Sequence, residues 1–374
     1  MEVADIMQPK TIKIIMLGDS LCKQGGIVTV QKLILEQVPP NIQIEHIASA
    51  GDGSGIQKIV FFGIALCKLV LKLLSTEVDI LHIHVAERAS TFRKSIVTLI
   101  VLIWRKPVIL HAHGPEFRLF YSKLPQFLKE WISWVFRRSD RFIVLSESWK
   151  NYYINDVGLK PEQVVVLPNP AKLPAQVPHR PNSDIVNFVF LGRIGQRKGS
   201  FDLIEAYANL PAEYKNRARL ILAGDGDVMQ AQSLITTLNL SNYITVSSWL
   251  DSEQRDALLA KADVFVLPSY NEGLPMSILE AMSWGLPIIT TPVGGIPELV
   301  THSKNGLLVN PGDIQQLSEA MKSLIENDKL RLSLGSNARV TVIPYDVKNY
   351  FSSLVCIYHS LLGFKQPSYV ETAK

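Results

Sequence analysis

Residues 262–291, ADVFVLPSYNEGLPMSILEAMSWGLPIITT, predict the secondary-structure unit that decides the fold. The first run, ADVFVLPS, is short, apolar and bounded by turn residues, which is typical of a buried strand. LPMSILEAMSW then has the apolar spacing of a helix, with Pro275 at the expected first helical position and Gly285 as the stop signal. LPIITT is a second apolar strand. This order predicts two parallel strands joined by a crossover helix.

The same alternation extends over most of the chain. Strands are expected at 13–18, 78–84, 106–113, 141–146 and 164–169, and again at 186–192, 218–224, 244–250, 262–269 and 286–291. Between the two sets, residues 168–181 are rich in proline and resemble a stiff linker. We therefore expect an α/β protein with two Rossmann-like doubly wound domains and an interdomain cleft. The N-terminal domain would span residues 1–175, completed by a C-terminal helix at about 346–374, and the C-terminal domain residues 183–345.

The composition is that of ordinary globular protein, with 47% hydrophobic and 19% charged residues among 374. Residues 1–10 carry two acids and lack the apolar stretch of a secretory signal. The apolar runs at 59–67 and 95–104 are shorter than the roughly 20 residues that a membrane-spanning helix needs. Three widely spaced cysteines suit free thiols in a reducing compartment. These features predict a cytoplasmic protein.

Charge is distributed unevenly, since Lys and Arg outnumber Asp and Glu up to residue 178 but not after it. The apolar segment WISWVF at 131–136 lies close to the basic residues Arg137, Arg138, Arg141 and Lys150. Such a segment is compatible with shallow peripheral contact with the anionic inner face of the cell membrane. The sequence favours the alternative, which is an ordinary solvated helix face.

Two glutamates are the first candidates for ligand binding. Glu272 lies in the loop before the predicted helix and Glu280 inside it, roughly 12 Å further along the axis at ~1.5 Å per residue. This exceeds the ~5 to 9.5 Å between the paired carboxylates of glycoside hydrolases. The separation would let the two carboxylates bind opposite ends of a long polyhydroxylated ligand. The charged middle of that ligand would lie at the helix start, formed by Gly273, Leu274 and Pro275. A nucleotide sugar has this shape; the alternative is a capping carboxylate and an ordinary polar helix position.

Cations and glycines follow other predicted strands. Arg193 and Lys198 lie in the loop after strand 186–192, where a phosphate site of the second domain is expected. Backbone approach to a diphosphate is also expected at Gly25 and Gly26, after the first strand, and at Gly224 in the turn AGDGD. Surface basic residues and ligand-free turns are the alternatives. The two aspartates of AGDGD imitate a metal-binding Asp-x-Asp, but their place in a turn after a strand favours a structural role.

Histidines end two neighbouring strands as two His-x-His pairs, His82 with His84 and His111 with His113. A four-histidine metal site is one interpretation. The sequence supplies no obvious carboxylate or thiolate partners, so we expect no metal there and cleft-lining histidines instead. Ser146, which ends strand 141–146, either contacts the ligand or caps the following helix.

Several of these motifs together resemble a known family. Glu272 and Glu280 match the Glu-seven-Glu motif of the retaining nucleotide-sugar glycosyltransferases of family four, which have the GT-B fold. LGRIGQRKG at 191–199 is similar to that family's Gly-Arg-x5-Lys-Gly element, and KIIMLGDSLCKQGGIVTV at 13–30 to its N-terminal glycine loop. HIHVAERASTFRKS, ILHAHGPEF and IVLSESWK most resemble the bacterial exopolysaccharide branch, which includes mannosyltransferases acting on polyprenyl-diphosphate oligosaccharides. The likeness runs from about residue 12 to 363.

The resemblance implies a role for each matching residue. His113 would reach the donor sugar near the reacting carbon, Glu272 would orient the sugar and Glu280 the ribose. Arg193 and Lys198 would hold the diphosphate without a metal ion or other cofactor. Asn169 is kept from the family's Asn-Gly-Val-Asp element, but Pro170 replaces the glycine, which puts the hinge geometry of the family in doubt.

The implied reaction moves a hexose, with retention, from GDP-mannose or a UDP-hexose to a glycan or polyprenyl-diphosphate-linked acceptor in cell-surface polysaccharide biosynthesis. No nucleic-acid partner is expected. Two alternatives stay open: a nucleotide-sugar epimerase or hydrolase on the same fold, and an inactive sugar-binding protein.

Overall fold

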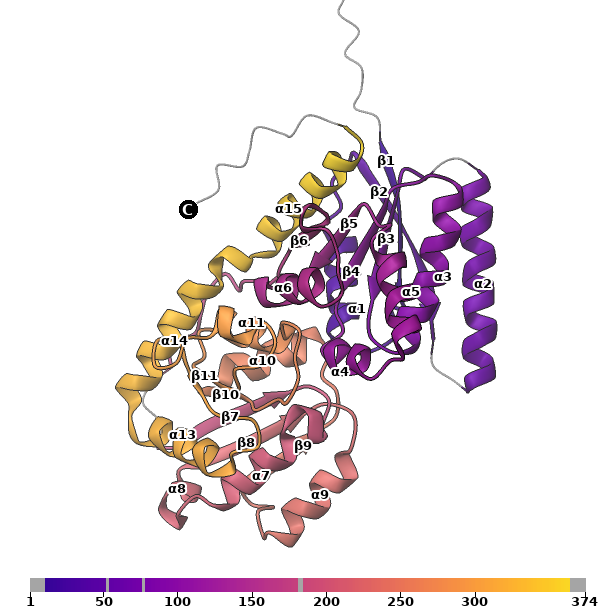
Figure 1. The fold of residues 1–374 in the computed structure, drawn as a ribbon. Coiled ribbons are helices and arrows are strands. Elements are labelled where there is room, and N and C mark those ends of the chain that lie inside the picture. The colour runs from indigo at the N-terminus through magenta and orange to yellow at the C-terminus, as the bar shows by residue number, and fades with distance from the viewer. Residues whose placement is uncertain (1–10, 52–53, 76–77, 181–183, 364–374) are drawn as a thin grey trace, which may run out of the picture. The chain divides into compact units, whose positions relative to one another are not determined.

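The computed structural model describes residues 11–51, 54–75, 78–180 and 184–363. The chain forms two compact units: unit 1 comprises the residues up to Leu167 together with those from Lys348, and unit 2 spans Pro168–Val347. Each unit contains one six-stranded sheet whose neighbouring strands are all parallel (Figure 1). The segment 1–10, used above for the signal-peptide prediction, and the last part of the expected C-terminal helix, 364–374, lie outside the described residues.

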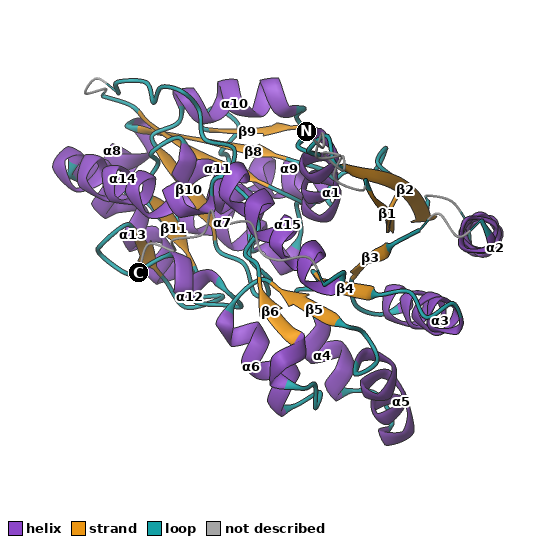
Figure 2. Ribbon diagram, turned by 90° about the horizontal axis from the view of Figure 1, so that it is seen from above, coloured by secondary structure: helices purple, strands orange, loops and turns teal. Residues whose placement is uncertain are grey.

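The sheet of unit 1 has the order β2-β1-β3-β4-β5-β6. Its strands are β1 (Ile12–Asp19), β2 (Ile42–Ala50), β3 (Ile80–Val85), β4 (Val108–Ala112), β5 (Arg141–Val144) and β6 (Val164–Val166). Its helices are α1 (Gly26–Glu36), α2 (Gly55–Leu74), α3 (Ala89–Ile103), α4 (Phe117–Ser122), α5 (Gln126–Phe136), α6 (Glu147–Asn155), the short η1 (Pro161–Gln163) and α15 (Val347–Leu361). Figure 2 shows α2, α3 and α5 on one face of this sheet, with α1 and α15 on the other.

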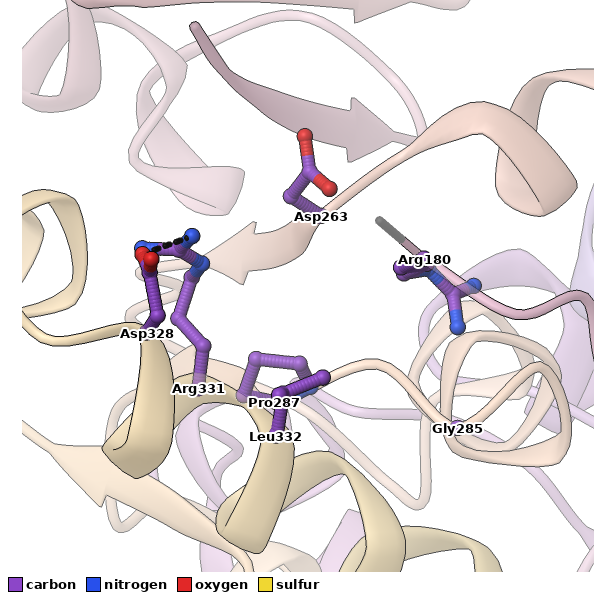
Figure 3. A pocket seen from close by; sticks show the side chains of 7 residues that line it. All are labelled: Arg180, Asp263, Gly285, Pro287, Asp328, Arg331 and Leu332. Carbon is purple, nitrogen blue, oxygen red and sulfur yellow. Dashed lines mark hydrogen bonds and ion pairs between the residues drawn. The ribbon is translucent and has the colours of Figure 1, made fainter. Parts of the chain in front are cut away.

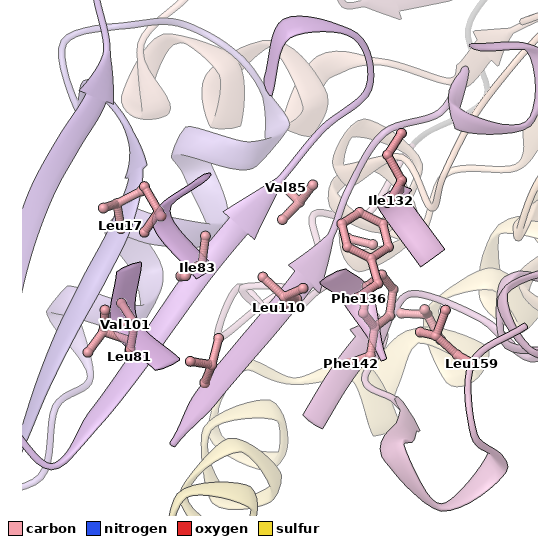
Figure 4. Close-up of a cluster of buried hydrophobic side chains, with 14 of the residues drawn as sticks. Leu17, Leu81, Ile83, Val85, Val101, Leu110, Ile132, Phe136, Phe142 and Leu159 are labelled. Carbon is pink, nitrogen blue, oxygen red and sulfur yellow. The ribbon is translucent and has the colours of Figure 1, made fainter. Parts of the chain in front are cut away.

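The core of unit 1 fills the space between the sheet and the α2, α3 and α5 layer. Alternate residues of a strand point to opposite faces, so Leu81, Ile83 and Val85 of β3 join this core while His82 and His84 face the other side. Leu110 of β4 follows the same rule, and helix residues such as Ile132, Phe136 and Leu69 complete the cluster (Figure 4). Burial of these side chains at roughly 25 cal/mol per Å² of apolar surface is the main source of stability.

The sheet of unit 2 has the order β12-β11-β10-β7-β8-β9. Its strands are β7 (Val186–Leu191), β8 (Ala218–Ala223), β9 (Ile244–Ser247), β10 (Val264–Leu267), β11 (Ile288–Thr290) and β12 (Gly306–Leu308). Its helices are η2 (Gln196–Lys198), α7 (Ser200–Ala208), α8 (Ala212–Asn216), α9 (Val228–Thr237), α10 (Ser252–Lys261), α11 (Met276–Ser283), α12 (Ile296–Leu299), α13 (Ile314–Glu326), α14 (Asp328–Val342) and η3 (Ile343–Tyr345). Counted along the chain from β7, this order is that of a Rossmann fold.

The predicted doubly wound α/β class is therefore confirmed, with three local corrections. β2 and β12 were not expected: β2 is an edge strand whose Gln43 and Glu45 face solvent, and β12 has only three residues. Pro275 is the N-cap of α11, and the first helical residue is Met276. Within the described part of the chain, no helix combines the length and hydropathy that crossing a bilayer needs.

Candidate active site

The order of strands in unit 2 creates a switch point between β7 and β10. From β7 the chain adds β8 and then β9 on one side, and then returns to place β10 on the other side of β7. The loops that leave the carboxyl ends of β7 and β10 therefore diverge, and ligands of open α/β sheets bind in the crevice that such loops form. Lys198 comes from the loop after β7 and Glu272 from the loop after β10.

These two side chains form a buried ion pair. Lys198 Nζ lies 2.5 Å from Glu272 Oε1, and the side chains are only 14% and 5% exposed. The Ser269 hydroxyl also donates to Glu272 Oε1, at 2.7 Å. Two donors thus converge on one carboxylate oxygen, which fixes the orientation of the carboxylate in a site that water hardly reaches.

Glycines allow the two loops to approach each other. Gly199, directly after Lys198, has φ 67°, and a Cβ at this position would lie 2.1 Å from the Pro268 carbonyl oxygen. Gly224 permits a similar close approach between the turn after β8 and the loop after β7, since a Cβ at this position would lie 1.8 Å from the Gly192 carbonyl oxygen. Any side chain at either position would push the loops apart. The sequence element at 191–199 is thus built for close backbone packing around Lys198.

The start of α11 offers backbone donors next to Glu272. Gly273, Leu274 and Pro275 are buried. Asn169 Nδ2 donates to the Leu274 carbonyl at 2.7 Å, and the Gly295 N–H donates to the Gly273 carbonyl at 2.7 Å. Among the described residues, the N–H groups of Gly273 and Leu274 have no hydrogen-bond partner. Unpaired N–H groups at a helix N-terminus are suited to an anion.

Glu280 lies on the first turns of α11 and is mostly buried, with 13% of its side chain exposed. Arg255 of α10 lies 3.3 Å from it. Burial raises the pKa of Glu280 to about 7; Arg255 acts in the opposite direction, and nearby Asp256 adds to the rise. The carboxyl group can therefore exist in both protonation states near neutral pH.

Arg193 lies in a different setting from Lys198. Its guanidinium pairs with Asp225 at 3.3 Å, and both side chains are substantially exposed, at 67% and 39%. Asp225 is thus the partner of a cation in the turn after β8, and Asp227 is the N-cap residue of α9. Exposed pairs of this kind contribute about 0 to 1 kcal/mol, so Arg193 can change partners at little cost.

In unit 1, the four strand-end histidines form one buried stack. His84 Nδ1 lies 2.8 Å from His113 Nε2, and His82 Nε2 lies 3.2 Å from His111 Nδ1. His82 Nδ1 also contacts the Tyr358 hydroxyl of α15, at 2.8 Å. Burial is the main cause that lowers the pKa of all four, to about 3 for His82 and His113, so the rings are neutral at pH 7.

Nitrogen atoms of His82, His84 and His111 lie within 4.8 Å of one another, close enough to consider a metal site. The ring planes argue against it. They stack at 15° to 30° with centroids 4.6 to 5.3 Å apart, whereas a bound ion must lie near the plane of every ring that coordinates it. Nearly parallel rings do not share such a point. The geometry favours a stack of neutral, hydrogen-bonded imidazoles that holds His113 in place.

The other predicted residues of unit 1 occupy helix starts. Gly25 is the N-cap residue of α1, and Gly26 is its first residue. Ser146 is the N-cap residue of α6, where its hydroxyl accepts from the Trp149 N–H at 3.3 Å. A capping role for Ser146, one of the two alternatives above, is thus observed directly.

Sequence reasoning missed two polar residues that contact the glutamates, and one buried lysine of unit 1. Ser269 and Arg255 contact the two glutamates, although Ser269 could have been noticed because it ends the strand before Glu272. Lys94 of α3 is buried and donates to the Ser49 hydroxyl. Burial lowers its pKa to about 7, with Asp19 acting in the opposite direction. No pattern in the sequence marks a lysine on an amphipathic helix as buried.

A small polar cavity of about 50 Å³ lies elsewhere in unit 2. Figure 3 shows its lining residues: Arg180, Asp263, Gly285, Pro287, Asp328, Arg331 and Leu332. Asp263 and Pro287 directly precede β10 and β11, so the cavity is at the amino ends of these strands, on the edge opposite to Lys198 and Glu272. The Arg331–Asp328 pair at 2.5 Å fills one side of it. We assign it a structural role.

Comparisons with known proteins identify the family of the chain. The family described as Glycosyltransferase Family 4 matches residues 31–173, and Glycosyl transferases group 1 matches residues 175–341. An uncharacterized glycosyltransferase of Methanocaldococcus jannaschii is 26% identical over 74% of this chain and 74% of its own length. An Escherichia coli enzyme named UDP-Gal:alpha-D-GlcNAc-diphosphoundecaprenol alpha-1,3-galactosyltransferase is 27% identical over 75% of this chain and 74% of its own.

Among solved structures, Anabaena HepE in complex with UDP-glucose superimposes with a TM-score of 0.74 at 22% identity, covering 93% of this chain and all of that one. The likeness is one of fold. The two matched families together span both units, and the sheets have the order that the fold requires. The chain is a glycosyltransferase with the GT-B fold.

Proposed function

We propose that the protein transfers a hexose, with retention of anomeric configuration, from a nucleotide diphosphate sugar to a hydroxyl of a glycan or polyprenyl-diphosphate-linked acceptor. It would act in cell-surface polysaccharide biosynthesis, on the cytoplasmic side of the membrane and in peripheral contact with it. The observation that carries the proposal is the buried Lys198–Glu272 pair beside the unpaired N–H groups at the start of α11. It combines a sugar-binding carboxylate with donors for a diphosphate.

The proposed chemistry uses the charges of unit 2. The bond between the anomeric carbon and the diphosphate oxygen breaks, and negative charge develops on the leaving diphosphate. Lys198, Arg193 and the N–H groups of Gly273 and Leu274 stabilise this charge, so no metal ion is required. The acceptor hydroxyl forms the new bond from the same face and gives its proton to the leaving diphosphate. No protein base is needed on this route.

The remaining residues orient the donor. Glu272 accepts hydrogen bonds from hydroxyls of the hexose, and Glu280 accepts from the ribose. His113 contacts the sugar near the reacting carbon. The glycine-lined turns at Gly25, Gly26 and Gly224 allow close approach of backbone to the nucleotide or the acceptor. The basic unit 1 holds the acceptor, whose diphosphate or glycan is polar and, in the lipid-linked case, anionic.

UDP-hexoses are the first donors to test, with GDP-mannose next. The E. coli relative is named for UDP-galactose and a diphosphoundecaprenol-linked acceptor, and the Anabaena HepE structure contains UDP-glucose. The first experiment incubates the purified protein with each nucleotide sugar and measures the melting temperature. A donor that binds the folded state raises the melting temperature. At a concentration about one hundred times its Kd it stabilises the folded state by about 2.7 kcal/mol. The donor that binds is then used in transfer assays.

The decisive assay measures nucleoside diphosphate release with and without acceptor, and the anomeric configuration of the product by NMR. We expect acceptor-dependent release, an unchanged anomeric configuration, and full activity after treatment with EDTA. Lys198→Ala should lose transfer by about 10²-fold or more, as expected when a preorganised charge at the reacting group is removed. Arg331→Met, which breaks an ion pair at the opposite edge of the same sheet, should keep it.

The rival functions give different results in the same assay. An epimerase or hydrolase on this fold consumes the donor when no acceptor is present. An inactive sugar-binding protein shows the melting shift without turnover. Transfer by Lys198→Ala at the level of the unsubstituted protein would contradict the proposed role of the cation.

A further inference from the structure

Helix α2 is apolar on two opposite faces. One face packs into the core of unit 1 through Ala65, Leu69 and Leu73, which are almost completely buried. The other carries large apolar side chains that remain in water: Ile56 (77% exposed), Ile59 (72%), Val60 (55%), Ile64 (52%), Leu71 (68%) and Leu74 (62%). A helix that covers a sheet normally turns polar residues outward. The outward face of α2 departs from this rule along its whole length.

The exposed residues form one continuous stripe. Their spacings of three, four and seven positions place them on one side of a helix with 3.6 residues per turn. Two exposed residues of the neighbouring helix α3, Ile96 and Ile103, extend the apolar surface. Figures 1 and 2 show α2 as the outermost helix of unit 1, beside α3 and at the edge of the sheet formed by β2. The described part of unit 1 thus leaves this stripe uncovered.

The charges of α2 have one sign. Within Gly55–Leu74 the charged residues are Lys58, Lys68 and Lys72, and the segment contains no acid. At 3.6 residues per turn, Lys68 lies beside the apolar stripe, Lys72 lies one turn on and further round towards the sheet, and Lys58 lies near the amino end on the side opposite the stripe. Lys72 also pairs with Glu45 of β2 at 2.8 Å. Long basic side chains beside an apolar stripe can extend toward anionic groups while the stripe is buried.

We propose that the outward face of α2, extended by α3, binds the surface of an anionic phospholipid bilayer, with the helix lying in the plane of the interface. Lys68 would contact lipid phosphates, and the isoleucines and leucines would enter the acyl boundary. Charge complementarity favours this occupant over a second copy of the chain. Two α2 helices packed face to face would bring like charges together, and this helix offers no acid to compensate them.

This inference extends the membrane contact of the proposed function and moves it to a different surface. The sequence directs attention to 131–136, which lies on α5. There, Phe127 is 67% exposed, but Trp134 is only 41% exposed and is covered by the Arg138 guanidinium at 3.5 Å from its ring. Ile132 and Phe136 of the same segment are buried in the core. The apolar residues available to a bilayer are thus far more numerous on α2 than on α5.

The test measures binding of the full chain to vesicles by sedimentation, without donor or acceptor, so that its result is independent of transferase activity. Vesicles of phosphatidylcholine alone are compared with vesicles containing phosphatidylglycerol. We expect binding that requires the anionic lipid and weakens as salt is added. Ile59→Gln/Leu71→Gln should lower the partition coefficient by about tenfold or more, because both side chains leave the apolar boundary. Lys68→Gln should lower it by about fivefold, because this lysine lies beside the stripe.

Matched controls remove exposed apolar side chains elsewhere. Met229→Gln/Val340→Gln, on α9 and α14 of unit 2, should bind vesicles as the unsubstituted protein does, and Phe127→Gln on α5 should have little effect. All substituted positions are exposed, so circular dichroism should show unchanged folding. Absence of binding to anionic vesicles would overturn the inference, as would greater loss in Phe127→Gln than in the α2 variants. A dimer in light scattering that Ile59→Gln/Leu71→Gln dissociates would assign the stripe to a second copy instead.

Discussion

The Lys198–Glu272 pair predicts a specific cost when only one partner is removed. Lys198→Met keeps most of the side-chain volume but leaves the Glu272 carboxylate, 5% exposed, with the Ser269 hydroxyl as its remaining side-chain donor. Removing one member of a buried pair typically costs 3 to 5 kcal/mol, because the other charge stays buried and unpaired. We expect about 3 kcal/mol here, at the lower end, because the Ser269 bond persists and water can enter beside the 14% exposed position of Lys198.

A second substitution tests whether the unpaired charge is the cause. Glu272→Gln is close in shape and still accepts a hydrogen bond from Ser269 through its amide oxygen. In Lys198→Met/Glu272→Gln no buried charge is left, so most of the lost stability should return. We expect the double variant to be about 2 kcal/mol more stable than Lys198→Met; the Glu272→Gln single variant completes the cycle from which the coupling energy is calculated.

Urea unfolding is monitored by hydrogen exchange in peptides of β7 and β10, so that the stability of unit 2 is measured by itself. Arg331→Met and Arg331→Met/Asp328→Asn form a parallel cycle on the pair at the opposite edge of the sheet. Because Asp328 is 38% exposed, this cycle should show a coupling below about 1 kcal/mol. If Lys198→Met and its double variant agree within about 0.5 kcal/mol, the buried charge of Glu272 does not determine the stability of the site, and the reasoning is refuted.

Two further predictions concern the same unit. Burial raises the pKa of Glu280 from 4.5 to about 7, so the folded protein favours the protonated form of this carboxyl group. The free energy of unfolding should therefore fall by about 3 kcal/mol as the pH rises from about 4.5 to 7. The difference in urea midpoint between wild type and Glu280→Gln should change over this pH range and be constant above it. Gly199→Ala should lower the free energy of unfolding by about 2 kcal/mol or more, because its Cβ would clash with the Pro268 carbonyl at a positive φ. As a control, Gly63→Ala places a Cβ that has no atom within 4 Å. Thermal denaturation should show this variant to be as stable as the unsubstituted protein or more stable.

The sequence predicts the parallel sheets well because buried parallel strands read as apolar runs. β10 is a continuous run of this kind, and β7 and β8 are each interrupted once, by Asn187 and Arg219. All three were predicted within a few residues. β2 escapes the rule because it lies at the edge of its sheet, where Gln43 and Glu45 face water. Its pattern mixes polar and apolar residues, and only pairing with β1, which comes from tertiary structure, identifies it as a strand.

The site is predictable as a set of residues but not as a set of contacts. Motif spacing marks Lys198 and Glu272 separately, yet they are 74 positions apart and meet only because β7 and β10 are neighbours in the sheet. The same holds for Arg255, which reaches Glu280 from the preceding helix. Burial is equally hidden: His82 and His84 alternate with core residues of β3, and the sequence does not indicate that four rings stack and are neutral.

Arg193 and Lys198, the two cations proposed to bind the diphosphate, each form an ion pair in this structure, and the two pairs suggest different roles. Arg193 holds Asp225 in an exposed pair that costs little to exchange, so it can turn to an incoming phosphate and contribute mainly to affinity. Lys198 is different because its partner is Glu272, the carboxylate proposed to orient the sugar. A diphosphate that draws Lys198 away would leave Glu272 unpaired unless sugar hydroxyls replace the lost donor. On the proposed roles of these residues, we therefore expect phosphate and hexose binding to be coupled through one buried pair, so that a nucleoside diphosphate without its sugar binds more weakly than the nucleotide sugar.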